Sequence, residues 1–134
     1  MDPLSPTLTV SAITLFVEDL GACREFYARV FGAEPIFSDD ESTAYRLGAT
    51  VLNLLRSDAA DELVAPAVPG APGGPRSVFT IEVDDVDATA ALLAQRGVTL
   101  LNGTMDRPWG IRTASFVDPA GQVWELAGPK KGTA

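Results

Sequence analysis

Residues 109–126 read WGIRTASFVDPAGQVWEL, and they give the clearest local signal of structure in the chain. Two strand-like runs in it are joined by the tetrapeptide Asp118-Pro119-Ala120-Gly121. Proline presets φ for the second position of a tight turn, and glycine accepts a positive φ. The tetrapeptide therefore predicts a turn between two neighbouring strands.

The outgoing strand carries one acid, Glu125, among apolar residues. Side chains alternate between the two faces of a strand, so Glu125 shares a face with Val123 and lies opposite Trp124. Burying a carboxylate without a partner would be costly. Glu125 is therefore the first candidate for a functional side chain.

Outward from this stretch, the same order of elements is expected twice along the chain. The alternating and β-branched runs predict strands, and the apolar stripes at helical spacing predict one helix in each half. The expected strands are 9–17, 34–38, 43–48 and 50–56 in the first half and 77–83, 98–102, 111–117 and 122–128 in the second. The first helix is expected directly after Asp19, and the second over residues 86–96.

The first of these helices has a clear apolar stripe and clear ends. Its apolar residues are Cys23, Phe26, Tyr27, Val30 and Phe31, at the spacing of one helix face. Asp19 is suited to cap its start and Gly32 to close its end. Cys23, the single cysteine, is expected to be a small buried side chain, and no histidine is present to activate it as a nucleophile.

An internal repeat relates the two halves. FVEDL at 16–20 matches EVDDV at 82–86, and ATVLNL at 49–54 matches GQVWEL at 121–126. Each half is too small to bury a sheet alone. We therefore predict an α+β fold in which two β-α-β-β-β modules form an open, cup-shaped mixed sheet with the helices outside.

The connector between the modules is rich in proline and glycine. Residues 57–76 contain four prolines and three glycines, so they predict an extended segment with at most one helical turn. The whole chain is expected to be one domain, with module one at 9–56 and module two at 77–128. A connector this long is explained by its joining two modules.

Composition narrows the classes of function. The 134 residues are 46% apolar and 21% charged, with a net charge of −8. That charge argues against nucleic acid and anionic lipid as partners. The start of the chain lacks the features of a signal peptide and no run is long enough to span a membrane, so a cytoplasmic location is expected.

The acids occur in clusters, which leave two interpretations open. The clusters are Asp39-Asp40-Glu41, Asp58 with Asp61-Glu62, and Glu82-Asp84-Asp85-Asp87. One interpretation is a solvated surface that keeps the protein soluble. The other is a negative field that attracts a cationic small molecule.

Three segments together resemble the vicinal oxygen chelate superfamily. They are VEDLGACREFYARVFG at 17–32, FTIEVDDVDATAALLAQRGV at 79–98 and PWGIRTASFVDPAGQVWEL at 108–126. This superfamily includes glyoxalases, extradiol dioxygenases, epimerases, fosfomycin-modifying enzymes and bleomycin-resistance proteins. The resemblance covers roughly residues 9–128 and implies the fold more strongly than any one activity.

In metalloenzymes of this superfamily, four strand residues hold a divalent ion. The resemblance puts those positions at Ala12, Asn53, Val78 and Glu125, of which two are aliphatic. Such sites need three or four imidazole or carboxylate ligands. With the ligand positions that the resemblance implies, we therefore expect no metal, no other cofactor and no catalytic residue.

The segment around Trp109 is similar to the bleomycin-resistance branch, which implies a protein that sequesters a drug for resistance or self-protection. The expected ligand is cationic and partly planar, because a tryptophan ring offers a flat wall to such a group. Phe37 and Tyr45 are candidates for further aromatic wall. The expected site also includes residues on the same strands and at the retained acid: Thr14, Phe16, Asn53, Arg112 and Glu125.

Glu125 has three possible partners at this level: Asn53, a cationic group of the ligand, or Arg112 as a salt partner. Two competing functions also stay open. One is a lyase, isomerase or dioxygenase of the same superfamily with an atypical active site. The other is a module whose cup serves as a dimer interface. The resemblance also implies a homodimer, in which modules are exchanged between chains or paired within one chain.

Overall fold

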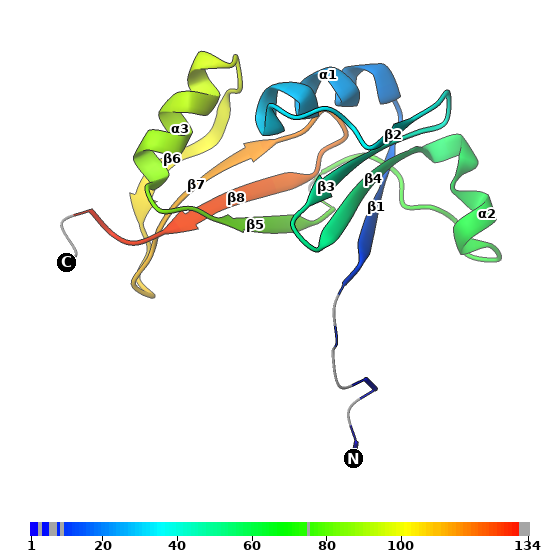
Figure 1. The fold of residues 1–134 in the computed structure, drawn as a ribbon, viewed down its shortest axis with the longest axis horizontal. Helices are drawn as coiled ribbons and strands as arrows, with labels where there is room; N and C mark the ends of the chain where they lie inside the picture. Colours follow the sequence, from blue (N-terminus) through cyan, green and yellow to red (C-terminus); the bar gives the residue numbers. More distant parts are fainter. Residues whose placement is uncertain (3, 6–7, 9, 75, 132–134) are drawn as a thin grey trace. The chain divides into compact units, whose positions relative to one another are not determined.

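The computed structural model describes residues 1–2, 4–5, 8, 10–74 and 76–131, and its elements follow the expected order (Figure 1). Two residues of the predicted elements, Thr9 and Pro75, lie outside the described residues. The elements are β1 (Ala12–Val17), α1 (Leu20–Phe31), β2 (Phe37–Ser38), β3 (Ser42–Leu47), β4 (Thr50–Arg56), a 3₁₀ turn η1 (Ser57–Ala59), α2 (Asp61–Val64), β5 (Val78–Glu82), α3 (Val86–Gln95), β6 (Leu100–Asp106), β7 (Arg112–Val117) and β8 (Val123–Gly128).

The two modules have the same sheet topology. The first sheet has the strand order β1-β4-β3-β2 and the second has β5-β8-β7-β6. In each sheet the first and last strands of the module pair in parallel, and the other neighbours pair antiparallel. The predicted α+β fold with two repeated β-α-β-β-β modules is therefore confirmed. That the two sheets together form an open cup stays a prediction.

Matching caps start the two long helices. Asp19 accepts a hydrogen bond from the backbone N–H of Ala22 at 3.0 Å, and Asp85 accepts one from Ala88 at 3.0 Å. These contacts satisfy N–H groups that the first turn of a helix leaves without a partner. The second acid in each of the repeated EDL and DDV segments, Asp19 or Asp85, is thus explained by helix capping.

The predicted turn at Asp118 is confirmed and is held by its own side chain. The backbone N–H of Gly121 donates to the carbonyl of Asp118 at 3.1 Å, and Gly121 has a φ of 90°. The Asp118 carboxylate also accepts from the N–H groups of Ala120 at 2.9 Å and Gln122 at 2.8 Å. The turn therefore fixes the register in which β8 returns beside β7.

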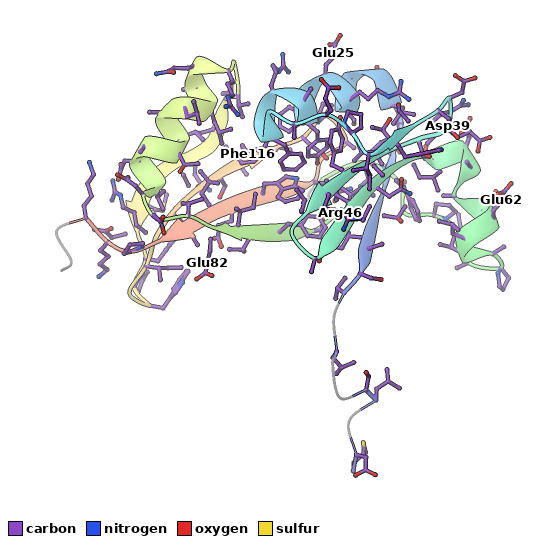
Figure 2. The ribbon with its side chains drawn as sticks, in the orientation of Figure 1. Glu25, Asp39, Arg46, Glu62, Glu82 and Phe116 are labelled. Carbon is purple, nitrogen blue, oxygen red and sulfur yellow. The ribbon has the colours of Figure 1, made fainter. Side chains whose placement is uncertain are left out.

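A buried chain of hydrogen bonds ties this turn to α1. The Tyr27 hydroxyl donates to Asp118 and accepts from the indole N–H of Trp124 at 2.9 Å. Rings of Tyr27, Phe31 and Phe116 surround Trp124 with centroid separations of 6.0 to 6.5 Å. Figure 2 shows Phe116 between the second sheet and α1. This aromatic cluster is the core on the helix side of the second sheet.

The first sheet has its own core on the side that meets the start of α1. Its fully or almost fully buried residues are Leu15, Val17, Tyr45, Leu52 and Leu54. Arg24 of α1 donates through Nε to Thr43 at 2.6 Å on this side. Cys23 is fully buried, as expected for a small side chain on the apolar stripe of α1.

The described chain divides into two compact units that differ from the sequence modules in one respect. The first comprises Met1–Arg24 and Ala33–Pro69, and the second Glu25–Gly32 and Gly70–Ala134. The boundary falls inside α1, because Phe26, Tyr27 and Phe31 pack with the aromatic residues of the second sheet. Helix α1 thus belongs to both units.

Three elements differ from the sequence prediction. Strand β2 is only Phe37–Ser38, β6 runs over Leu100–Asp106 instead of 98–102, and the connector holds both η1 and α2. Gly97 has a φ of 81°, and the N–H groups of Gly97 and Val98 still bond to carbonyls of α3. Strand β6 therefore starts later than predicted. None of the helices in the described part of the chain combines the length and apolar character needed to cross a bilayer.

Candidate functional site

Within the described residues of the second unit, one face of the second sheet is free of helices, and Glu125 lies on it. Helices α1 and α3 both pack on the opposite face, beside Trp124 and Gly128. Strand pairing and alternation put a common set of side chains on the helix-free face: Val78, Thr80, Glu82, Thr113, Ser115, Val117, Val123, Glu125 and Ala127. Glu125 is half-buried in the middle of this set.

The Glu125 carboxylate is oriented by a neighbouring strand. Thr80 on β5 stands in register with Glu125 and donates its hydroxyl to Oε1 at 3.0 Å. On the other side, Ser115 of β7 is the register partner of Glu125. A hydroxyl donor stabilises the charged carboxylate and restricts its rotation. The arrangement therefore holds a negative charge at a fixed place on the helix-free face.

Asn102 extends this row of polar residues to β6. It pairs with Ser115, and its side-chain Oδ1 is buried and accepts no hydrogen bond from the described residues. A buried acceptor without a donor costs free energy, so a donor that reached this atom would stabilise the protein. Sequence reasoning missed Asn102 because the register shifts on both sides of it. Simple alternation along β6 does not predict its face.

Arg107 and Trp109 occupy the turn between β6 and β7. The turn is closed by the backbone N–H of Arg107, which donates to Ile111 at 2.7 Å, and by Gly110, which has a φ of 96°. The Arg107 guanidinium carbon lies 5.6 Å from the centroid of the Trp109 ring, and its Nε donates to Thr113 at 2.8 Å. Trp109 is 65% exposed. Sequence reasoning did not predict Arg107 as a site residue, because side chains in a turn do not alternate between two faces.

Of the three partners considered for Glu125, the salt partner Arg112 is ruled out, and Arg112 does not belong to the expected ligand site on that face. Arg112 pairs in register with Gly128, which puts its side chain on the helix side of the sheet. There its Nε and Nη2 hold the two oxygens of Asp87 at 2.8 and 2.9 Å, and its Nη1 contacts Asp106 at 3.2 Å. This hydrogen bonding lowers the pKa of Asp87 to about 2 and raises the pKa of Arg112. Arg112 therefore secures α3 to β7.

An acidic hollow adjoins the helix-free face at the ends of β5 and β8. Its volume is about 530 Å³, and it is lined by Thr80, Glu82, Val83, Asp84, Ile111, Ala127, Gly128 and Pro129. Figure 2 shows Glu82 on the side of β5 away from α3. Neither Glu82 nor Asp84 forms an ion pair within the described residues, whereas Asp85 caps α3 and Asp87 binds Arg112. Two of the four clustered acids are thus left to act on a ligand.

Counting only the described residues of its own unit, the first sheet has an equivalent helix-free face. Thr14, Asn53, Ala44 and Phe37 stand in one row across its strands, and Phe37 is 53% exposed. Phe16 alternates onto the same face of β1. Through the internal repeat, the Thr14 and Asn53 pair corresponds to the Thr80 and Glu125 pair of the second sheet. Four predicted site residues therefore share one face of the first sheet.

Tyr45 does not belong to that face. It pairs with Leu52 on the helix side, is only 2% exposed and donates its hydroxyl to the carbonyl of Arg24 at 3.3 Å. Burial raises the pKa of its phenol. The prediction that Tyr45 contributes an aromatic surface to a ligand site is therefore wrong. Ala44, its neighbour on β3, pairs with Asn53, so Tyr45 points to the opposite face. Tyr45 is a core residue.

The four metal-ligand positions implied by the resemblance do not fit a metal ion. Ala12 and Val78 have no donor atom, Asn53 offers a neutral amide, and Glu125 is the single carboxylate. In the described part of the chain, no three histidine, cysteine, aspartate or glutamate residues are grouped so that they could hold an ion. Carboxylate and imidazole ligands are what divalent ions in such sites require. The donor set is therefore too poor for a metal centre.

Comparison with known proteins identifies the family. The model of the Glyoxalase/Bleomycin resistance protein/Dioxygenase superfamily matches residues 9–126, and the chain belongs to this superfamily. No curated protein matches the sequence.

Solved structures share the fold. A glyoxalase-related enzyme from Fulvimarina pelagi is 30% identical, with a TM-score of 0.77 and coverage of 91% of this chain and 88% of that one. A glyoxalase/bleomycin resistance protein/dioxygenase from Nocardioides is 23% identical, with a TM-score of 0.82 and coverage of 96% and 88%. A lactoylglutathione lyase from Agrobacterium tumefaciens is 23% identical, with a TM-score of 0.74 and coverage of 92% and 96%.

Proposed function

We propose that the protein binds a small molecule through a cationic group on the helix-free face of the second sheet, and that it sequesters this molecule without a metal. The observation that carries the proposal is the Glu125 carboxylate, held at a fixed place by Thr80 at 3.0 Å. Among the four positions that the resemblance assigns to metal ligands, it is the one ionisable side chain. An ammonium or amidinium group is the natural partner of such a carboxylate.

Two neighbouring features support a donor-rich cation. The free Oδ1 of Asn102 accepts hydrogen bonds but cannot donate them, so it favours a ligand group with several N–H bonds. Glu82 and Asp84 line the adjoining hollow and add negative charge near the same face. Charges of one sign in a concave surface raise the local concentration of an oppositely charged ligand.

The planar part of the ligand is proposed to lie near Trp109. Its ring is largely exposed, and Arg107 lies over it. A second planar group stacked there would gain about 0.5–1.5 kcal/mol beyond its area of burial. Sequestration of a cationic, partly planar compound would suit drug resistance or self-protection, the role of the bleomycin-resistance branch.

The alternative is an enzyme of the same superfamily with an atypical site. The similarity to a lactoylglutathione lyase, at 23% identity, supports a common fold and no more. A lyase, isomerase or dioxygenase that depends on a metal would lack its ligands here. Glu125 could still act as a general base, since it is half-buried and oriented. Turnover of a bound ligand would identify this alternative.

The test is a thermal-shift screen against cationic, planar antibiotics, because a ligand that binds only the folded protein raises its Tm. For the strongest hit, calorimetric titration of Glu125→Gln is expected to show at least about tenfold weaker binding, and added salt should weaken binding by screening over about 8–10 Å. Glu25→Gln is the control, because Glu25 is an exposed acid on α1. Equal affinities of the Glu125→Gln and Glu25→Gln variants would refute the proposal.

We also expect the purified protein to carry no stoichiometric divalent metal, because Ala12 and Val78 cannot ligate one. Elemental analysis of protein produced in metal-supplemented medium is the measurement. About one equivalent of zinc, nickel, manganese or iron per chain, lost in Glu125→Gln, would contradict this expectation. Such a result would favour the enzyme alternative.

A further inference from the structure

Arg107 brings a positive charge to the same face that carries Glu125. Its Nε donates to Thr113, and Thr113 lies on the helix-free face because it pairs in register with Ala127. The Trp109 ring packs against the other side of the guanidinium, at 5.6 Å from its carbon. These two contacts restrict the rotamers of Arg107, which is half-buried. Arg107 therefore loses less rotamer entropy when it binds a ligand.

The Arg107 guanidinium is bound to Thr113 through Nε, and its two terminal nitrogens can bind another group. Within the described residues its two terminal nitrogens form no hydrogen bond or ion pair, although the chain has an excess of acids. By contrast, Arg112 uses all three of its nitrogens on Asp87, Asp106 and Thr104. The terminal edge of an arginine matches a carboxylate in a bidentate pair. Arg107 is therefore prepared for an anionic group from outside the chain.

The backbone positions that anchor the two charged side chains have a defined spacing. Thr113 lies opposite Ala127 on β8, and Ala127 is two residues from Glu125 along the same strand. A rise of about 3.4 Å per residue and a strand separation of about 4.8 Å put the Thr113 and Glu125 positions about 8 Å apart. A ligand that reaches both must carry its charges at opposite ends of a rigid or extended body.

From this spacing we infer that the ligand is a zwitterion whose cationic group binds Glu125 and Asn102 and whose carboxylate binds the terminal nitrogens of Arg107. The inference rests on the proposed function, because it uses the same face and the same cationic group. It changes the role of Trp109, whose ring then holds Arg107 in place as well as offering a surface to the planar body of the ligand. It also explains how an acidic protein can accept a carboxylate.

Three matched compounds test the inference: 4-(aminomethyl)benzoate, which carries both charges across a planar ring, benzylamine, which has only the cation, and benzoate, which has only the anion. Binding to the full chain is followed by chemical-shift titration of the backbone amides. We expect the zwitterion to bind about tenfold more tightly than benzylamine, which is the effect of one added charged hydrogen-bonded contact.

Arg107→Gln is expected to abolish that difference, because only the zwitterion loses a charged contact when the guanidinium is removed. Arg107→Lys, which keeps the charge and loses the planar fork, should give an intermediate affinity and provides a second variant if the first is poorly folded. Arg29→Gln is the control, because Arg29 is an exposed arginine on α1 and its loss changes the net charge equally.

The failures of the two proposals are distinguishable. If benzylamine binds as tightly as the zwitterion and both depend on Glu125, the zwitterion inference is overturned and the proposed function stands. If benzoate alone binds and Glu125→Gln has no effect, the cationic function is overturned, and with it the zwitterion. Binding of none of the three compounds at millimolar concentration would overturn both.

Discussion

The Tyr27 hydroxyl joins two buried polar groups that have no access to bulk water, the Asp118 carboxylate and the Trp124 indole N–H. Tyr27→Phe keeps the ring and removes these two hydrogen bonds. Leaving buried polar atoms without partners costs about 1–3 kcal/mol, so the free energy of unfolding should fall by that amount. Urea denaturation measures it.

Tyr45→Phe is the matched control, because the hydroxyl of Tyr45 makes a longer contact of 3.3 Å to a backbone carbonyl. We expect a smaller loss for this variant. Equal effects of the two substitutions would show that the hydrogen bonds of Tyr27 have no special weight in the core.

The ion pair between Arg112 and Asp87 predicts a pH dependence of stability. Hydrogen bonding to Arg112 lowers the pKa of Asp87 from its ordinary value of 3.8 to about 2. The contribution of this pair is therefore present above pH 3.8 and is lost as pH falls towards 2. In Asp87→Asn, the fall in Tm between these pH values should be shallower than in the unchanged protein, as measured by calorimetry at matched ionic strength. Parallel profiles would contradict the assignment.

At the level of residues, the sequence predicted what depends on periodicity. The burial of Cys23, the caps at Asp19 and Asp85 and the side of β8 that carries Glu125 all follow from helix or strand spacing. Tyr45 was assigned from its closeness to an acidic turn and Arg112 from its closeness to Trp109, and both lie on the helix side. The pairing register of β3 with β4 and of β7 with β8 puts Tyr45 and Arg112 on the opposite faces from Asn53 and Glu125. Arg107 and Asn102, in a turn and at a register shift, have no such pattern.

At the scale of elements, Gly128 at the end of β8 has closer neighbours than the other described glycines. A Cβ at Gly128 would lie 2.5 Å from the carbonyl oxygen of Val83 and 3.1 Å from a methyl group of Val86. Backbone cannot yield as a flexible side chain does. Gly128→Ala should therefore lower the free energy of unfolding by about 1–3 kcal/mol, the usual cost of overpacking. Chemical denaturation at a fixed pH measures the change.

Gly103→Ala on β6 provides the comparison, because a Cβ there would have no atom within 4 Å and its φ is not in the left-handed region. We expect this variant to be neutral or slightly stabilising, since alanine restricts the unfolded chain. A Gly128→Ala variant as stable as Gly103→Ala would mean that β8 shifts easily at its end.

The order and type of the elements could be predicted from the sequence, whereas some of their limits could not. The repeat of a capped helix between strands fixed the β-α-β-β-β order of both modules. Strand β2 is short because only Phe37 and Ser38 pair with β3, and that pairing depends on contacts far from the local pattern. The register shifts in β6 have the same origin.

For the whole molecule, the homodimer implied by the superfamily stays a prediction, as does the cytoplasmic location. Light scattering at micromolar concentration is expected to give twice the chain mass. Exchange of equivalent elements between copies is a low-cost route to a symmetric pair. A mass equal to one chain across a tenfold range of concentration would contradict the dimer.

Because α1 is divided between the two units, a cut in the connector would separate part of the helix from the aromatic residues that it packs against. A break in the connector at 57–76 would leave the whole helix on the amino-terminal fragment, where Phe26, Tyr27 and Phe31 would lose Phe116 and Trp124 as packing partners. The carboxyl-terminal fragment would expose the aromatic face that α1 covers. Each piece would thus carry half of a complementary apolar surface, so the two fragments should reassociate when mixed and could serve as a split reporter.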